Sequence, residues 1–131
     1  MYVYTNAYVY PFSGYAITAG SYFNEKNPYY ASSAPRSADL TGLVVVFKFP
    51  VNHFAELTVH GQQYGEYFGA ALTSCDVNGD RRHELIVSAP LWSRDVDEGR
   101  VYIFSARYNV CSPFPTSPIL NSQILCNALK D

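Results

Sequence analysis

Short runs rich in Val, Ile, Thr, Tyr and Phe recur along the chain and are separated by Gly, Pro, Asn and Ser. Residues 55–60 and 100–104 alternate between the two faces that a strand presents, and residues 43–47 form a similar but more apolar run. Runs of this kind are typical of β-strands bounded by turns. No stretch shows the 3.6-residue periodicity of an amphipathic helix. The pattern therefore predicts an all-β protein.

An internal repeat organises these strands. Residues 14–35 align without a gap on residues 69–90, and both segments run 22 residues from Gly to Pro. A second glycine, Gly42 or Gly99, then precedes the next strand of each unit. The two units are offset by 55 residues at the first glycine and by 57 at the second. Because short strands recur in the same order, the repeat favours propeller blades over a sandwich.

The expected fold is thus a partial β-propeller of two four-stranded antiparallel blades with an irregular C-terminal tail. Residues 1–61 would form the first blade with an N-terminal strand, residues 62–107 the second blade, and residues 108–131 the tail. Prolines within residues 112–118 remove ladder donors, and residues 119–131 are compatible with a weak helix. Two blades leave strand edges exposed, so we expect the isolated chain to be marginally stable.

A nine-residue loop in the second unit carries side-chain oxygens at alternate positions, and Gly79 allows it to bend tightly. The predicted Ca²⁺ ligands are the side chains of Asp76, Asn78, Asp80 and Glu84 and the main-chain carbonyl of Arg82. Calcium takes about six to eight oxygen ligands, and this loop supplies several of them. An EF-hand would need Glu at the twelfth position, where Val87 stands. The prediction is therefore a structural calcium loop in a β-hairpin.

The competing interpretation is a solvated Asn-Gly turn that is acidic by chance. Arg81 and Arg82 support it, because positive charge beside the site weakens the binding of a cation. The first unit has a loop at the corresponding place, with Ser21, Phe23, Glu25 and Tyr29 at the ligand positions. Too few oxygens remain there, so we expect that loop to bind no calcium.

Charge and titratable residues narrow the function further. The formal net charge is −2, and the few Lys and Arg are scattered, which argues against a nucleic-acid partner. His53, His60 and His83 have no metal-ligand spacing and are expected at the surface. No nucleophile elbow, phosphate-binding glycine loop or acid/base pair of carboxylates is recognisable. We therefore predict no catalysis.

The three cysteines show no CxxC spacing, so neither a zinc knuckle nor a thioredoxin-like redox site is expected. Cys75 lies in a predicted strand and is expected to be a small core residue. If the chain is extracellular, a bridge between Cys111 and Cys126 is the one we would consider.

Four motifs of the second unit resemble, in order and spacing, one complete FG-GAP repeat of the integrin α propeller. They are Tyr67-Phe68-Gly69, residues 76–80, residues 84–90 and residues 99–104. The first unit is similar to a degenerate copy, and together the two cover roughly residues 10 to 106. Two departures are visible: Ser33 and Ser88 replace the Gly of "GAP", and Arg81 stands where the family usually has Gly.

The resemblance implies a ring of seven repeats, with calcium in the later blades and a degenerate blade before them. It also implies that the loops of a blade differ in role. Calcium loops lie on the lower face, and loops such as residues 91–98 lie on the upper face, which meets ligand and the β subunit. The contact residues implied by the resemblance are Tyr67, Phe68, Trp92, Arg94 and Asp95. The plainer alternative is that the aromatic residues are core and the loop is an ordinary polar one.

As a function, the resemblance implies the head of an adhesion receptor that binds extracellular matrix or cell-surface ligands as an α/β heterodimer. Its location would be the extracellular side of the plasma membrane, although the sequence shows neither a signal peptide nor a transmembrane run. One alternative is the FG-GAP propeller of a secreted enzyme such as glycosylphosphatidylinositol-specific phospholipase D, with the chemistry in another domain. Another is a truncated product with no independent function.

Overall fold

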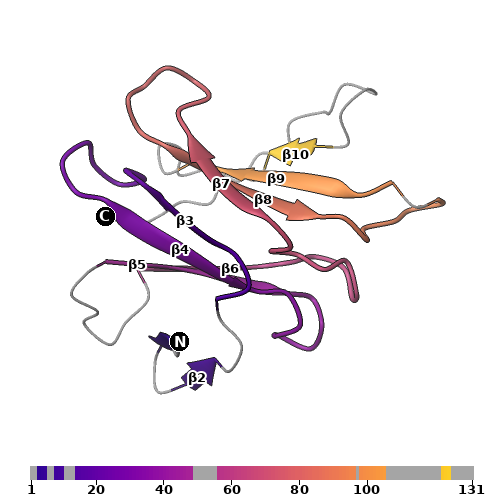
Figure 1. The fold of residues 1–131 in the computed structure, drawn as a ribbon. Helices are drawn as coiled ribbons and strands as arrows, with labels where there is room; N and C mark the ends of the chain where they lie inside the picture. The colour runs from indigo at the N-terminus through magenta and orange to yellow at the C-terminus, as the bar shows by residue number, and fades with distance from the viewer. Residues whose placement is uncertain are drawn as a thin grey trace.

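Three groups of strands make up the described part of the chain (Figure 1). The computed structural model describes residues 14–48, 56–96 and 98–105, together with the backbone of three short strands outside these ranges. The strands are β1 (Val3–Thr5), β2 (Tyr8–Tyr10), β3 (Ile17–Gly20), β4 (Tyr29–Ala34), β5 (Leu43–Phe47), β6 (Leu57–His60), β7 (Leu72–Cys75), β8 (Glu84–Ala89), β9 (Arg100–Phe104) and β10 (Ser122–Ile124). β1 and β2 form an antiparallel hairpin.

Two four-stranded sheets correspond to the two repeats. The first has the order β3-β4-β5-β6, with every neighbouring pair antiparallel. The second has the order β10-β9-β8-β7, in which β7, β8 and β9 are antiparallel and β10 runs parallel to β9. The prediction of an all-β partial propeller is thereby confirmed. The second sheet departs from the predicted four antiparallel strands, because only three of its strands are antiparallel and β10 is parallel to β9.

Both sheets have the same strand register at equivalent positions. Ile17 pairs with Ser32 in the first sheet, and Leu72 pairs with Val87 in the second. Adding the 55-residue offset of the sequence repeat to the first pair yields the second. The third strands agree in the same way, since Ala34 pairs with Leu43, and Ala89 with Arg100. The Gly and Pro landmarks therefore mark equivalent points of one backbone pattern.

Ser33 and Ser88, which replace a family Gly, have matching hydrogen bonds. The Ser33 hydroxyl accepts from the N–H of Ala16 at 3.0 Å, and the Ser88 hydroxyl accepts from the N–H of Ala71 at 2.9 Å. A Cβ on Gly69 would come within 2.8 Å of the Ser33 Cβ, and Gly69 has a φ of 94°. Gly69 is thus needed both for its left-handed backbone and for the close approach of the two blades.

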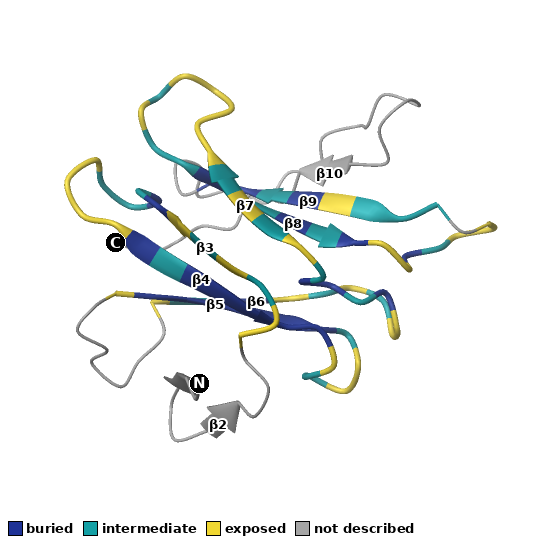
Figure 2. Cartoon of the chain, in the orientation of Figure 1, coloured by how far each residue is buried: buried dark blue, intermediate teal, exposed yellow. Residues whose placement is uncertain are grey.

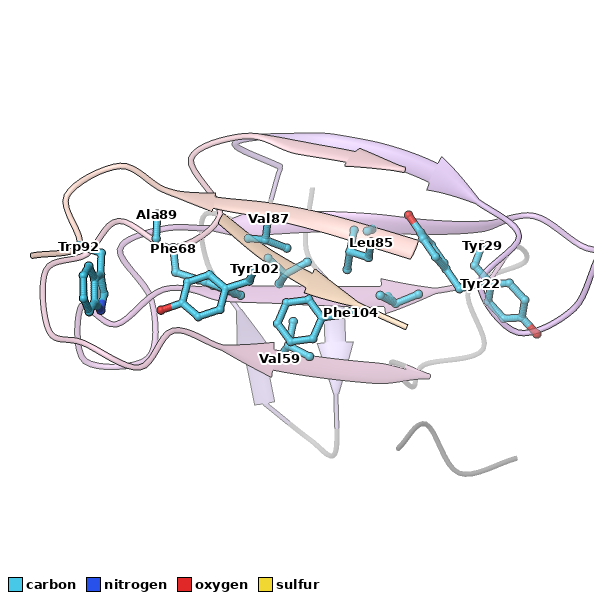
Figure 3. Packing of buried hydrophobic residues seen from close by; sticks show 13 residues of the cluster. Tyr22, Tyr29, Val59, Phe68, Leu85, Val87, Ala89, Trp92, Tyr102 and Phe104 are labelled. Carbon is cyan, nitrogen blue, oxygen red and sulfur yellow. The ribbon is translucent and has the colours of Figure 1, made fainter. Parts of the chain in front are cut away.

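The main hydrophobic core lies between the two sheets. Figure 3 shows its side chains in a row, with Trp92 at one end and Tyr22 and Tyr29 at the other. Phe68 is fully buried toward the Trp92 end and meets the rings of Tyr102 and Phe104 edge to face, with centroids 5.1 and 6.1 Å away. This shared core joins one repeat to the next, as expected for neighbouring blades.

The third strands of the two sheets differ in how much of each face is covered (Figure 2). Val44 and Val46 of β5 are 0% and 1% exposed. Val101, which is equivalent to Val44, is 37% exposed in β9, and Ile103 is half-buried. β5 is therefore covered on both faces, because Leu43, Val45 and Phe47 form a second buried cluster on its other side.

Two details differ from the sequence predictions. Ser122–Ile124 form β10, whereas we expected an irregular tail with a weak helix there; the rest of residues 108–131 lies outside the described residues. Cys75 is exposed, not a core residue, because it is the last residue of β7 and shares the outward face of that strand with Thr73. Cys111, Cys126 and His53 lie outside the described residues.

Candidate metal centre

The candidate calcium loop connects β7 to β8 and is folded around the carboxylate of Asp76. Asp76 Oδ1 accepts from the N–H of Gly79 at 2.6 Å and from that of Asp80 at 3.1 Å. Its Oδ2 accepts from the N–H of Arg81 at 2.8 Å. Local desolvation raises the pKa of Asp76, but these backbone donors and that of Asn78 outweigh it, so the pKa is lowered overall. An ionised Asp76 therefore holds the loop closed.

Asn78 and Asp80 continue the same arrangement. The N–H of Asp80 donates to Asn78 Oδ1 at 2.9 Å, and the N–H of Arg82 donates to Asp80 Oδ1 at 2.8 Å. These are Asx turns, in which a short side chain replaces a backbone acceptor. Three alternate positions of the loop, 76, 78 and 80, thus present side-chain oxygens toward the turn.

Two residues of the loop adopt left-handed backbone conformations. Gly79 has a φ of 77° with open space where a Cβ would be, and Arg81 has a φ of 68°. The left-handed region costs an ordinary L-residue about 1–2 kcal/mol. The conformation explains why Gly at position 81 suits this loop and shows that Arg81 is a strained substitute.

Glu84 begins β8 and is 2% exposed. Its Oε2 accepts from the N–H of Val77 at 2.9 Å, and its Oε1 accepts from the Asn78 amide at 3.0 Å and the Ser105 hydroxyl at 3.1 Å. A buried carboxylate is costly unless it is compensated, and these three donors are neutral groups. Glu84 therefore fixes the loop to the end of β9 and concentrates negative charge beneath it.

The donor set suits calcium in its chemistry. Asp76, Asn78, Asp80 and Glu84 are hard oxygen donors, and one hydrogen-bonded loop holds all four. Among the described residues, however, no three His, Cys, Asp or Glu side chains converge as a ready metal cluster. The carboxylate oxygens are instead turned toward the loop's own N–H groups. Calcium ligation by these side chains and by the Arg82 carbonyl stays a prediction.

The residues implied as partner contacts fall into two groups. Phe68 is 0% exposed and Trp92 is 8% exposed, so both are core residues in this chain. Tyr67 is half-buried, and its ring meets that of Tyr15 edge to face at 5.7 Å. Arg94 and Asp95 are exposed on the loop that follows β8. Only Tyr67, Arg94 and Asp95 present surface to a partner.

The loop that bears Arg94 and Asp95 is anchored by residues that the sequence did not single out. The Gln63 side-chain amide donates to the Ser93 carbonyl at 2.7 Å, and its Oε1 accepts from the Ser93 N–H at 2.9 Å. The Arg100 guanidinium lies over the Trp92 ring at 3.5 Å from its centroid, a cation–π contact. The Gln63 side chain thus pairs with both main-chain polar groups of Ser93, as the backbone of a neighbouring strand would.

Glu66 is a second buried carboxylate that sequence reasoning missed. It is 0% exposed and accepts from the N–H groups of Gln62 and Gln63 and from the Tyr102 hydroxyl, the last at 2.6 Å. Burial, followed by this carboxylate, raises the pKa of Tyr102. The structure shows why a glycine stands at position 61: a Cβ there would lie 2.2 Å from Glu66 Oε1. The sequence pattern by itself does not indicate this contact.

Comparison with known proteins agrees with this structure. The FG-GAP repeat family matches residues 68–104, from the start of the second blade to the end of β9. Integrin alpha-PS2 of Drosophila melanogaster is 33% identical over 96 residues, which cover 69% of this chain and 7% of that protein. Integrin alpha-PS5 of the same species is 38% identical over 97 residues, covering 70% of this chain and 10% of that protein. Integrin alpha-4 of Xenopus laevis is 35% identical over 92 residues, covering 70% and 9%.

The blades and the matched motif define an FG-GAP repeat protein of the β-propeller class. Within that class, the relatives identify the chain as an FG-GAP segment of the integrin α family. The chain spans about a tenth or less of the length of these relatives. In the described part of the chain, no helix is long and apolar enough to cross a bilayer.

Proposed function

We propose that the chain forms part of the propeller head of a cell-adhesion receptor and that its second blade binds a structural Ca²⁺ in the loop of residues 76–84. The observation that carries the calcium proposal is Glu84, a buried carboxylate beneath a loop of further carboxylates. A bound divalent cation would supply positive charge to this set and tie β7 to β8 through oxygen ligands. The expected role is structural, and no catalysis is proposed.

Each predicted ligand has a defined task in this proposal. Asp76 and Asp80 supply charge from the turn, Glu84 supplies it from the first position of β8, and Asn78 already bridges the turn to Glu84. The Arg82 carbonyl adds a neutral oxygen from the main chain. The cost is that carboxylate oxygens must exchange some loop N–H groups for the ion. We therefore expect moderate affinity, further weakened by Arg81 and Arg82.

Calorimetric titration of the chain with Ca²⁺ tests the site. Wild type should release or absorb binding heat, whereas Asp80→Ala should lose most of it. Glu25→Ala is the matched control, because Glu25 occupies the equivalent position of the first loop and is exposed. Equal heats from wild type and Asp80→Ala would exclude Asp80 as a ligand. A loss of heat in Glu25→Ala would place calcium in the loop of the first blade and contradict the proposal.

The adhesion role rests on the relatives, on the exposed side chains of Arg94 and Asp95, and on the half-buried Tyr67. Relatives that are integrin α subunits favour this role over the propeller of a secreted enzyme. We propose that an integrin β subunit and an extracellular ligand contact these three residues, at the outer side of the plasma membrane. Co-precipitation of the chain with an integrin β head should weaken in Tyr67→Ala. Tyr64→Ala is the control, since Tyr64 lies three residues away and is 72% exposed.

A further inference from the structure

A polar seam joins the two blades along their first strands. β3 and β7 lie side by side (Figure 1), and the Ser74 hydroxyl of β7 hydrogen-bonds with the hydroxyls of Thr18, at 3.2 Å, and Tyr22. Thr18 belongs to β3, and Tyr22 to the loop that follows it. The seam meets the apolar core at Tyr22, whose ring belongs to that core, and it lies next to both hairpin loops.

The calcium loop reaches across this seam through His83. The His83 N–H donates to the Ser21 carbonyl at 3.1 Å, and the Ser21 N–H donates to His83 Nδ1 at 3.3 Å. Two hydrogen bonds between the same two residues fix both the main chain and the ring of His83. Ser21 is the first-blade equivalent of Asp76, since the two are 55 residues apart. The candidate calcium loop of the second blade is therefore hydrogen-bonded to the equivalent, degenerate loop of the first blade.

The packing around His83 is tight on the side of the first blade. A Cβ on Gly20 would lie 3.0 Å from His83 Nδ1, 3.0 Å from the Ser74 Cβ and 3.0 Å from Tyr22 Cε1. Gly20 is buried. Such distances are shorter than ordinary carbon contacts, so any side chain at position 20 would press on His83. The seam thus depends on a glycine that lies in β3, outside the calcium loop.

His83 stands between two predicted ligands, the Arg82 carbonyl and the Glu84 carboxylate. A residue held at both its main chain and its ring restricts the backbone on each side of it. The geometry points to His83 as a positioning residue that couples the calcium loop to the neighbouring blade, so that calcium binding and the packing of the two blades strengthen each other. This inference rests on the calcium site proposed above. Because coupling between two equilibria is reciprocal, it can be measured from either side.

Hydrogen exchange of the Ser21 amide measures the coupling from the first blade. With Ca²⁺ instead of chelator, exchange at Ser21 should slow on the order of fivefold in wild type. His83→Ala should abolish this difference, and His83→Asn should restore part of it, because the Asn Oδ1 can take the place of Nδ1 as acceptor. His60→Ala is the matched control, since His60 is exposed at the end of β6. A calcium effect at Ser21 that persists in His83→Ala would overturn the inference.

Calcium affinity of a first-blade variant measures the coupling from the other side. Gly20→Ala should weaken Ca²⁺ binding on the order of fivefold without altering any predicted ligand. Ala19→Ser, at an exposed neighbouring position of β3, should bind as wild type does. If wild type binds calcium but Ser21 exchange and the Gly20→Ala affinity are unchanged, the coupling is wrong and the calcium site stands. If wild type binds no calcium, both proposals fall.

Discussion

The two hairpin loops join equivalent strands in the same register and are closed by different chemistry. In the first, Tyr22 and Tyr29 are buried, and Phe23 packs on Tyr29 with ring centroids 4.6 Å apart. In the second, the position equivalent to Tyr29 is Glu84, and the loop closes around carboxylates. One backbone turn can therefore be stabilised by apolar burial or by oxygen donors. In the calcium proposal, only the second loop would respond to a cation.

Removal of the apolar anchor should have the largest effect on stability. Tyr29→Ala is expected to cost about 3 kcal/mol, because it leaves a cavity beside Phe23 in the main core. The loss should be the same with calcium and with chelator, since the first loop lacks the oxygen set. Urea denaturation followed by circular dichroism measures it. A loss that depends on calcium would contradict the division of roles between the loops.

Removal of the carboxylate anchor should cost less but depend on calcium. Glu84→Leu is expected to lose about 1–3 kcal/mol in chelator, because the Ser105 hydroxyl loses a buried carboxylate acceptor and the partly buried hydrogen bond from the Val77 N–H is lost. Calcium should stabilise wild type further and leave Glu84→Leu unchanged. Thermal melts with and without Ca²⁺ measure the loss of stability in chelator and the stabilisation by calcium. Glu56→Gln, at an exposed position, serves as the control.

Backbone strain in the second loop offers a stabilising change. Arg81→Gly should gain about 1 kcal/mol, because Gly adopts a φ of 68° without the steric cost that Arg incurs. It should also tighten calcium binding by removing a positive charge. Gly79→Ala should do the reverse and lose about 1 kcal/mol at a φ of 77°. Equal stability of the two variants would show that the left-handed turn is not the source of strain.

The smallest expected effect on stability at neutral pH comes from the Tyr102 phenol, and this effect should change at alkaline pH. Tyr102 is equivalent to Val45 of the first blade, so its phenol is particular to the second. Burial and Glu66 raise its pKa above the ordinary 10.0, which means that the folded state holds the proton more tightly than the unfolded state. Its contribution is fully present below pH 10 and is lost as the pH rises above that value.

Tyr102→Phe tests this dependence. At neutral pH the variant should lose about 1 kcal/mol, because Glu66 loses a donor. Above pH 10 the difference from wild type should shrink, since wild type then loses the stabilisation that the variant lacks. Tyr64→Phe, at an exposed position, is the control. The prediction is wrong if the two stability curves stay parallel through this range.

The sequence predicted the blades because glycine and proline landmarks act locally. Gly69 and Gly42 occupy positions where a left-handed backbone or close contact excludes other residues, so their spacing reports the register directly. The hydrogen-bonded acidic loop was predictable for a similar reason, since its oxygens lie within nine residues, and calcium binding there stays a prediction. Its ligand geometry was not, because the same oxygens can accept from the loop's own N–H groups.

Long-range contacts were beyond the sequence pattern. Glu66 is buried because a tyrosine 36 residues away donates to it, and nothing near Glu66 announces that partner. His83 was expected at the surface, yet its ring is bonded to Ser21, 62 residues away. Cys75 could have been placed correctly, because Leu72 and Ser74 are the residues of β7 that turn inward. Which face of a short strand is covered is decided by the next blade.

The matched register of Ile17 with Ser32 and Leu72 with Val87 makes the two blades interchangeable parts. A transplant of residues 14–35 into the place of residues 69–90 preserves the spacing of every landmark and both serine hydroxyls that accept from the opposite strand. The backbone of these two strands is therefore independent of the loop chemistry, and the same register accommodates either an apolar or an acidic loop.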